Sequence, residues 1–166
     1  WIEVFNLGSV ADDEAVSKTM TTLDVYGDAA YVAACGRCNS STRVDRPFEA
    51  HLATNVGGDE LPEKGTSKGW HFATMEGLPD RYISAVKIDP AQTSTVYVGL
   101  GGYGEPRYLP PGRYLDANTN IGTGNVFKSI DAGESFVDIS GDLPQVHVGS
   151  IEMRGTQLIA GTDVGV

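Results

Sequence analysis

Basic residues are scarce in this 166-residue sequence, in which 12 Lys and Arg stand against 22 Asp and Glu, for a formal net charge of -10. Nucleic-acid binding needs clustered positive charge to neutralise phosphates, so the balance argues against a nucleic-acid partner. Long apolar runs are lacking as well. No stretch reaches the roughly 18 apolar residues of a membrane-spanning helix, so the sequence predicts no membrane span.

Cysteine is also rare, and its two copies, Cys35 and Cys38, form one Cys-x-x-Cys pair. A structural zinc site needs four ligands, and the three scattered histidines are poorly placed to complete one. Redox pairs of this spacing usually open a helix, whereas the flanks here indicate a strand followed by a loop. A local disulfide is the favoured interpretation, with free thiols and a metal or redox pair as alternatives. We expect no metal and no cofactor.

Sustained helical periodicity is missing, although the acidic stretch at 10–18 is compatible with one short helix. Glycine, by contrast, is abundant, with 21 copies beside 8 Pro. Tight turns use both residues, because glycine adopts positive φ and proline ends strands. Hydrophobic residues at 40% and charged residues at 20% give a globular composition. The sequence therefore predicts a folded chain with many turns.

An internal repeat organises the sequence. The pattern at 31–33 (Tyr-Val-Ala) returns 66 residues later at 97–99 (Tyr-Val-Gly) and again at 158–160 (Leu-Ile-Ala). Trp70 is followed at the same lag by Phe136. Separate landmarks that share nearly one period indicate repeated structural units.

Each unit is predicted to contain four short antiparallel strands. Residues 83–88 alternate apolar and polar side chains as a half-buried strand does, and Asp89-Pro90 ends that strand. The predicted strands lie at 20–26, 29–34, 50–55 and 70–75, then at 83–88, 95–100, 125–129 and 135–139, with a further unit starting at 148–153. Such repeats are typical of propeller blades, whereas a β-sandwich lacks an internal repeat. The predicted units are 18–79, 80–144 and 145–166, with 1–17 as the end of a preceding blade and a linker.

One eight-residue motif in the second unit is specific enough to suggest a family. Residues 129–136 read Ser-Ile-Asp-Ala-Gly-Glu-Ser-Phe, which has the form S-x-D-x-G-x-S-F. This motif and its flanking strands resemble the Asp box, or bacterial neuraminidase repeat, of sialidases, xyloglucanases and sortilin-type proteins. The resemblance implies an all-β fold, a β-propeller fragment of four-stranded antiparallel blades with Asp-box hairpins, on a secreted or cell-surface protein. The first unit departs from the motif, because Asn55 stands where Asp is expected.

The Asp box is predicted to stabilise the fold. An Asp at a hairpin tip accepts hydrogen bonds from the backbone of its own turn, and Gly adopts a conformation that other residues resist. The aromatic residue that follows is expected to be buried between neighbouring sheets. We therefore assign Ser129, Asp131, Gly133 and Phe136 a structural role, and no catalytic one.

A ligand-binding rim is predicted on the opposite face. In a propeller, the loops between second and third strands share one face with the connections between blades, which here brings together 36–48, 101–124, 79–82 and 144–147. Arg pairs bidentately with carboxylates, and Tyr offers a stacking surface with a polar tip, so the rim suits an acidic glycan or a protein segment. Alternatively, the aromatic residues only pack on neighbouring blades. The candidate rim residues are Arg81, Tyr82, Tyr103, Arg107, Tyr108, Arg113, Tyr114 and Asp116.

Three functions remain open at this stage. The favoured one is a binding or scaffolding module for glycan or protein ligands, and the alternative is part of a glycoside hydrolase of sialidase or xyloglucanase type. Tyr103 with Glu105, or Tyr82 with Asp80, match no family motif, so no catalytic residue is assigned. A third function is an assembly subunit, because two and a half blades leave sheet faces that the remaining blades, on the same or another chain, are predicted to cover.

Overall fold

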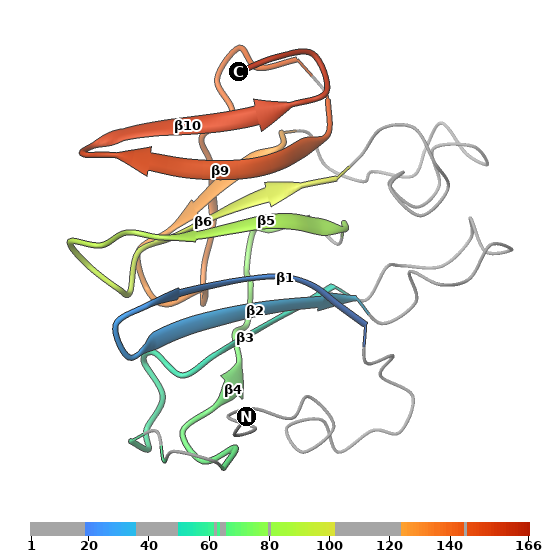
Figure 1. The fold of residues 1–166 in the computed structure, drawn as a ribbon. Coiled ribbons are helices and arrows are strands. Elements are labelled where there is room, and N and C mark those ends of the chain that lie inside the picture. The colour runs from blue at the N-terminus through green and yellow to red at the C-terminus, as the bar shows by residue number, and fades with distance from the viewer. Residues whose placement is uncertain are drawn as a thin grey trace, which may run out of the picture.

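The computed structural model describes residues 19–35, 50–61, 63, 66–79, 81–101, 124–144 and 146–166. Within these ranges the chain forms strands and turns and no helix (Figure 1). The described part therefore contains no helix of the length and apolar character needed to cross a membrane. The short helix considered at 10–18 lies outside the described residues.

The strands form two four-stranded sheets and a hairpin, all with antiparallel neighbours. The first sheet has the order β1 (Thr19–Tyr26), β2 (Ala29–Cys35), β3 (Ala50–Thr54) and β4 (His71–Phe72). The second sheet has the order β5 (Ile83–Ile88), β6 (Val96–Leu100), β7 (Val126–Ser129) and β8 (Val137–Asp138). The final hairpin pairs β9 (Val148–Arg154) with β10 (Gln157–Thr162). Each sheet follows chain order, so consecutive strands are neighbours. For the residues that the structure describes, the prediction of an all-β fold is confirmed.

The fourth strands are shorter than the sequence predicts. β4 covers two residues of the predicted 70–75, and β8 covers two of the predicted 135–139. After β4 the chain leaves its own sheet, because Met75 N–H donates to Gly133 O at 3.0 Å and Glu76 N–H donates to Glu134 O at 2.9 Å. Phe136 N–H returns a bond to Glu76 O at 2.7 Å. The end of the predicted strand at 70–75 therefore joins the first sheet to the second, whereas Ile139 at the end of the other donates to Val126 O of its own sheet at 2.9 Å.

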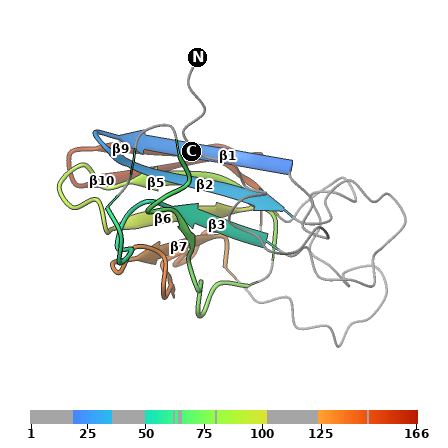
Figure 2. The same ribbon diagram turned by 90° about the horizontal axis from the view of Figure 1, so that it is seen from below.

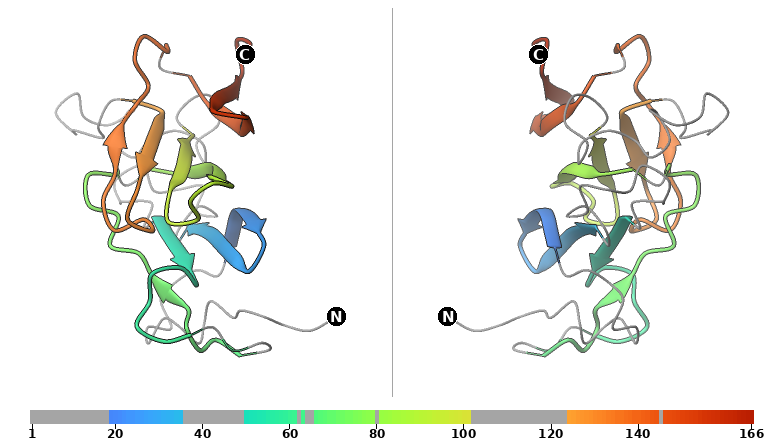
Figure 3. Two further views of the ribbon diagram at one scale, coloured as in Figure 1. Left: turned by 90° about the vertical axis from the view of Figure 1, so that its left-hand side faces the viewer. Right: turned by 90° about the vertical axis from the view of Figure 1, so that its right-hand side faces the viewer.

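The sheets pack face to face, and the main core lies between the first and the second (Figure 3). Tyr31 of β2 is fully buried there, and its hydroxyl donates to Thr93 O in the second sheet at 2.9 Å. Burial raises the pKa of Tyr31 to about 12, partly opposed by a hydrogen bond with Thr54. Tyr97 is the equivalent residue of the second unit, and it packs in the same way against Val148 and Ile151 of the third unit. Each sheet thus directs an equivalent tyrosine towards the sheet that follows.

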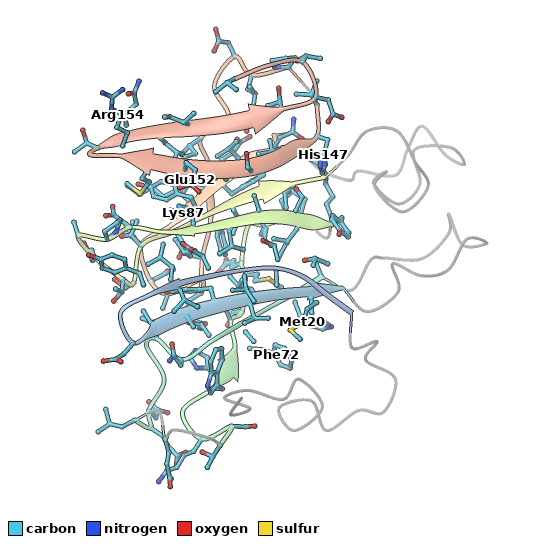
Figure 4. All side chains as sticks on the ribbon, viewed as in Figure 1. Met20, Phe72, Lys87, His147, Glu152 and Arg154 are labelled. Carbon is cyan, nitrogen blue, oxygen red and sulfur yellow. The ribbon has the colours of Figure 1, made fainter. Side chains whose placement is uncertain are left out.

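The first strands of the three units, β1, β5 and β9, lie side by side at one edge of the stack (Figure 2). Lys87 of β5 links them, with its Nζ 3.7 Å from Asp24 Oδ2 of β1 and 3.1 Å from Glu152 Oε2 of β9 (Figure 4). The hydrogen bond to Glu152 raises the pKa of Lys87, against the desolvation that lowers it. Asp24 also accepts from Ile88 N–H at 2.8 Å. These contacts hold the first strand of each unit beside the first strand of the next.

Candidate functional site

The hairpin at 129–136, called the Asp-box hairpin after the motif that it resembles, joins β7 to β8 and is closed by its own side chains. Ser129 Oγ accepts from Gly133 N–H at 2.8 Å and donates to Asp131 Oδ1 at 2.7 Å. Asp131 Oδ1 also accepts from Ser135 N–H at 2.9 Å, and its Oδ2 accepts from Ser135 Oγ at 2.5 Å. Ala132 and Gly133 adopt positive φ of 61° and 93°. The motif residues are thus brought together, and the carboxylate of Asp131 is occupied within its own turn.

The charge of Asp131 contributes to this turn. Desolvation alone would raise its pKa, but hydrogen bonds from Ser135 and Ser129 outweigh it and hold the pKa below the usual value of 3.8. A lowered pKa in the folded state means that the stabilisation is complete above the unfolded pKa. It is lost as the pH falls through the lower, folded pKa.

Replacing Asp131 with Asn is expected to make the protein less stable near neutral pH by about 1 kcal/mol, a small figure because the side chain is exposed. The difference from wild type should shrink as the pH falls below about 5 and through the lowered folded-state pKa of Asp131. Urea unfolding of both proteins across this pH range measures the effect. A difference that stays constant with pH would show that the charge plays no part.

The turn of the Asp box rests on the first sheet. A Cβ on Gly133 would lie 3.0 Å from Ala73 Cβ and 3.1 Å from Leu52 Cδ2. Ala132 is buried, and its Cβ lies 3.0 Å from where Gly57 would carry a Cβ. Phe136 completes the contact as a buried member of the main core. The hairpin therefore fastens the second sheet to the first.

Trp70, the repeat partner of Phe136, occupies the matching place in the first sheet. Both residues directly precede a fourth strand. Trp70 packs against Ala34 and Ala53, on the face of the first sheet that points away from the second. Trp70 is only partly buried there, whereas Phe136 is 6% exposed. The two aromatic residues therefore share a position in the repeat and differ in what covers them.

Asn55 forms bonds of its own in the first unit, where the Asp-box aspartate was expected. Its Oδ1 accepts from Ala30 N–H at 2.8 Å, and its Nδ2 donates to Asp28 O at 2.8 Å. Thr54 Oγ1 accepts from Val56 N–H at 3.1 Å, an i to i+2 contact like that between Ser129 Oγ and Asp131 N–H. The departure from the motif thus gives a differently bonded turn that joins β3 to β2.

Only part of the predicted rim is described. β2 and β6 run in the same direction and end on the same side of the molecule (Figure 1). The backbone of Tyr82 is held beside Gly101, whose N–H donates to Tyr82 O at 2.7 Å. The remaining rim residues, Tyr103, Arg107, Tyr108, Arg113, Tyr114 and Asp116, lie outside the described residues. The disulfide predicted between Cys35 and Cys38 likewise falls outside the side chains that the structure describes.

Arg81 has a different position from the one expected of an exposed ligand-binding residue. It is 2% exposed, and its guanidinium is held by acceptors on both sides of the loop at 102–123. Nη2 donates to Gly101 O at 2.8 Å and to Asn125 Oδ1 at 2.7 Å, while Nη1 donates to Gly124 O at 2.5 Å. Buried guanidinium groups require such acceptors because an unpaired charge is costly. Arg81 therefore clamps the base of the loop from inside.

Sequence reasoning missed a cavity at the β3–β4 hairpin. It has a volume of about 320 Å³ and is bordered by glycines, carboxylates, Trp70 and His71 of the first unit together with Glu134 of the Asp box. The carboxylates Asp59 and Glu60 lie in the insertion that the repeat pattern treated as a plain loop. The signal that could have identified them is the acidic, glycine-rich composition of that insertion next to a tryptophan.

Metal binding has no support in the described part of the chain, where no group of three or more His, Cys, Asp or Glu is placed to hold an ion. Comparison of the chain with protein-family models, curated proteins and solved structures gives no match.

Proposed function

We propose that this chain is part of a secreted or cell-surface β-propeller of the Asp-box kind, which binds or scaffolds glycan or protein ligands. Three features support the fold. Successive antiparallel sheets pack face to face, the first strand of each unit lies beside the first strand of the next, and the Asp-box hairpin fastens one sheet to its predecessor. A propeller arranges its blades in this order around an axis.

Further blades on the same or another chain are part of the proposal. Leu23 and Val25 of β1 are 58% and 57% exposed. Their neighbours Ala34 and Ala53 form a small apolar cluster with Trp70 and Phe72 on the same face of the first sheet. The corresponding face of the second sheet is covered by the first sheet. An apolar sheet face of this kind is normally covered, and another blade supplies a matching surface.

The clamp formed by Arg81 is the observation that carries the binding function. It ties Gly101 to Gly124, the residues on either side of the 22-residue segment 102–123, and so fixes the two positions that this segment connects. That segment contains Tyr103, Arg107, Tyr108, Arg113, Tyr114 and Asp116. Binding residues are commonly carried by loops on a rigid scaffold, and Arg with Tyr suits a carboxylate-bearing glycan or peptide.

Replacing Arg107 and Arg113 together with Ala tests this function on an array of acidic and neutral glycans. We expect the affinity for acidic glycans to fall at least about tenfold, since bidentate Arg–carboxylate pairs are lost. Arg154→Ala is the matched control, because Arg154 ends β9 at the edge opposite the rim. Unchanged affinity in the double variant would refute the rim as the binding surface. Turnover of a fluorogenic glycoside by the wild-type protein would favour the hydrolase alternative instead.

A further inference from the structure

The cavity at the β3–β4 hairpin is separate from the rim. β3 is antiparallel to β2, so β3 ends at the edge opposite the end of β2, and the hairpin loop leaves from there (Figure 1). The Asp box reaches the same edge and supplies one wall. The volume of about 320 Å³ is at the lower end of small-molecule sites and suits a group of a few heavy atoms. The described lining residues are Gly57, Gly58, Asp59, Glu60, Gly69, Trp70, His71 and Glu134.

An aromatic wall distinguishes this cavity from an ordinary acidic surface. Trp70 packs against Ala34 and Ala53 and also borders the cavity, which fixes the position of its indole. Indole is the side chain that attracts cations most strongly through its ring face. The ring of His71 packs closely against the backbone beside it, since a Cβ on Gly58 would lie 3.0 Å from His71 Nδ1.

The polar groups of the cavity are arranged as acceptors. Thr74 Oγ1 donates a hydrogen bond to Glu134 Oε2, so the carboxylate is held beside the first sheet. His71 Nε2 lies 3.9 Å from Glu134 Oε1. His71 Nδ1 is buried and has no hydrogen-bond partner among the described residues. This nitrogen lies against Gly58, so the acceptors that border the cavity are the oxygens of its carboxylates.

No Lys or Arg is found among the described residues that border the cavity, so the charges of Asp59, Glu60 and Glu134 are not balanced within its walls. A bound anion would be repelled. A planar or tetrahedral cation would instead pair with the carboxylates and face the indole of Trp70. We propose that this cavity binds a small organic cation, namely a guanidinium or ammonium group presented by a ligand or by a partner protein.

Titration of the protein with methylguanidinium and with methylammonium tests the proposal. The indole Nε1–H signal of Trp70 and the ring signals of His71, followed by NMR, should shift and saturate with a Kd on the order of millimolar. Methylurea has nearly the same shape as methylguanidinium without its charge, and it should bind at least about tenfold more weakly. Methyl glucoside tests for a neutral sugar. Saturation by methylurea or methyl glucoside at equal or lower concentration would overturn the proposal.

Two variants separate the cavity from its surroundings. Glu134→Gln keeps the shape of the side chain and should weaken methylguanidinium binding about tenfold. Glu76→Gln is the control, because Glu76 is exposed and does not border the cavity. Equal affinity in both variants would contradict the proposal, as would an absence of saturation in the wild type. Asp59→Asn, at an exposed loop position, repeats the test at a second carboxylate. Replacing Arg107 and Arg113 should leave this binding unchanged, so the rim and the cavity are tested independently.

Discussion

Arg81→Met is expected to lower the free energy of unfolding by about 3–5 kcal/mol, because three acceptors then lose their donor in the interior. Met fills a similar volume, so the loss reports the hydrogen bonds more than a cavity. The three acceptors are Gly101 O, Gly124 O and Asn125 Oδ1, and the Arg81 side chain that serves them is 2% exposed. Urea unfolding of the variant and the wild type measures the difference.

Arg154→Met is the control for this loss, since Arg154 is exposed and should change stability by less than about 0.5 kcal/mol. Arg81→Lys adds a second comparison. The single ammonium keeps the charge, but it cannot serve acceptors on two sides as a planar guanidinium does, so most of the loss should remain. A loss below about 1 kcal/mol in Arg81→Met would contradict the clamp. It would also remove the support that the clamp gives to a rim on a fixed base.

The strands could be predicted because their signal is local. The alternation at 83–88 gives β5 with the same bounds, and the predicted 29–34 and 50–55 each differ from β2 and β3 by one residue. The repeat also predicts a strand segment at 158–160, and these residues lie within β10. Such patterns depend on neighbours in sequence and on which side chains face the core.

The fourth strands and the position of Arg81 could not be predicted in this way. Residues 74–76 leave their own sheet because the Asp box of the next unit offers backbone acceptors at Gly133 and Glu134. Arg81 follows a Pro-Asp turn, which locally favours an exposed residue. It is buried because its acceptors come from residues at least 20 positions further along the chain. The cavity was missed for the same reason, since Glu134 reaches it from the second unit.

Phe136→Ala is the second change with a large expected effect. Its ring is 6% exposed in the main core between the two sheets, and truncating such a residue costs about 3–5 kcal/mol through lost burial and the cavity left behind. The backbone N–H of residue 136 donates to Glu76 O, and this bond remains in the Ala variant. The lost stability should therefore come from side-chain packing alone. Chemical denaturation of the variant measures it, and a loss below about 1 kcal/mol would show that the aromatic residue of the Asp box does not hold the sheets together.

Trp70→Ala makes this experiment a test of the wider architecture, because Trp70 occupies the same place in the repeat with one side of its sheet uncovered. In the 166-residue chain, Trp70→Ala should cost less than Phe136→Ala, by at least about 1 kcal/mol, despite the larger side chain. If a further blade covers Leu23, Val25 and Trp70 in a longer chain or a complex, the cost of Trp70→Ala should rise there towards that of Phe136→Ala. Equal costs in the isolated chain would mean that the outer face is already closed, and the proposed covering blade would then have no surface to occupy.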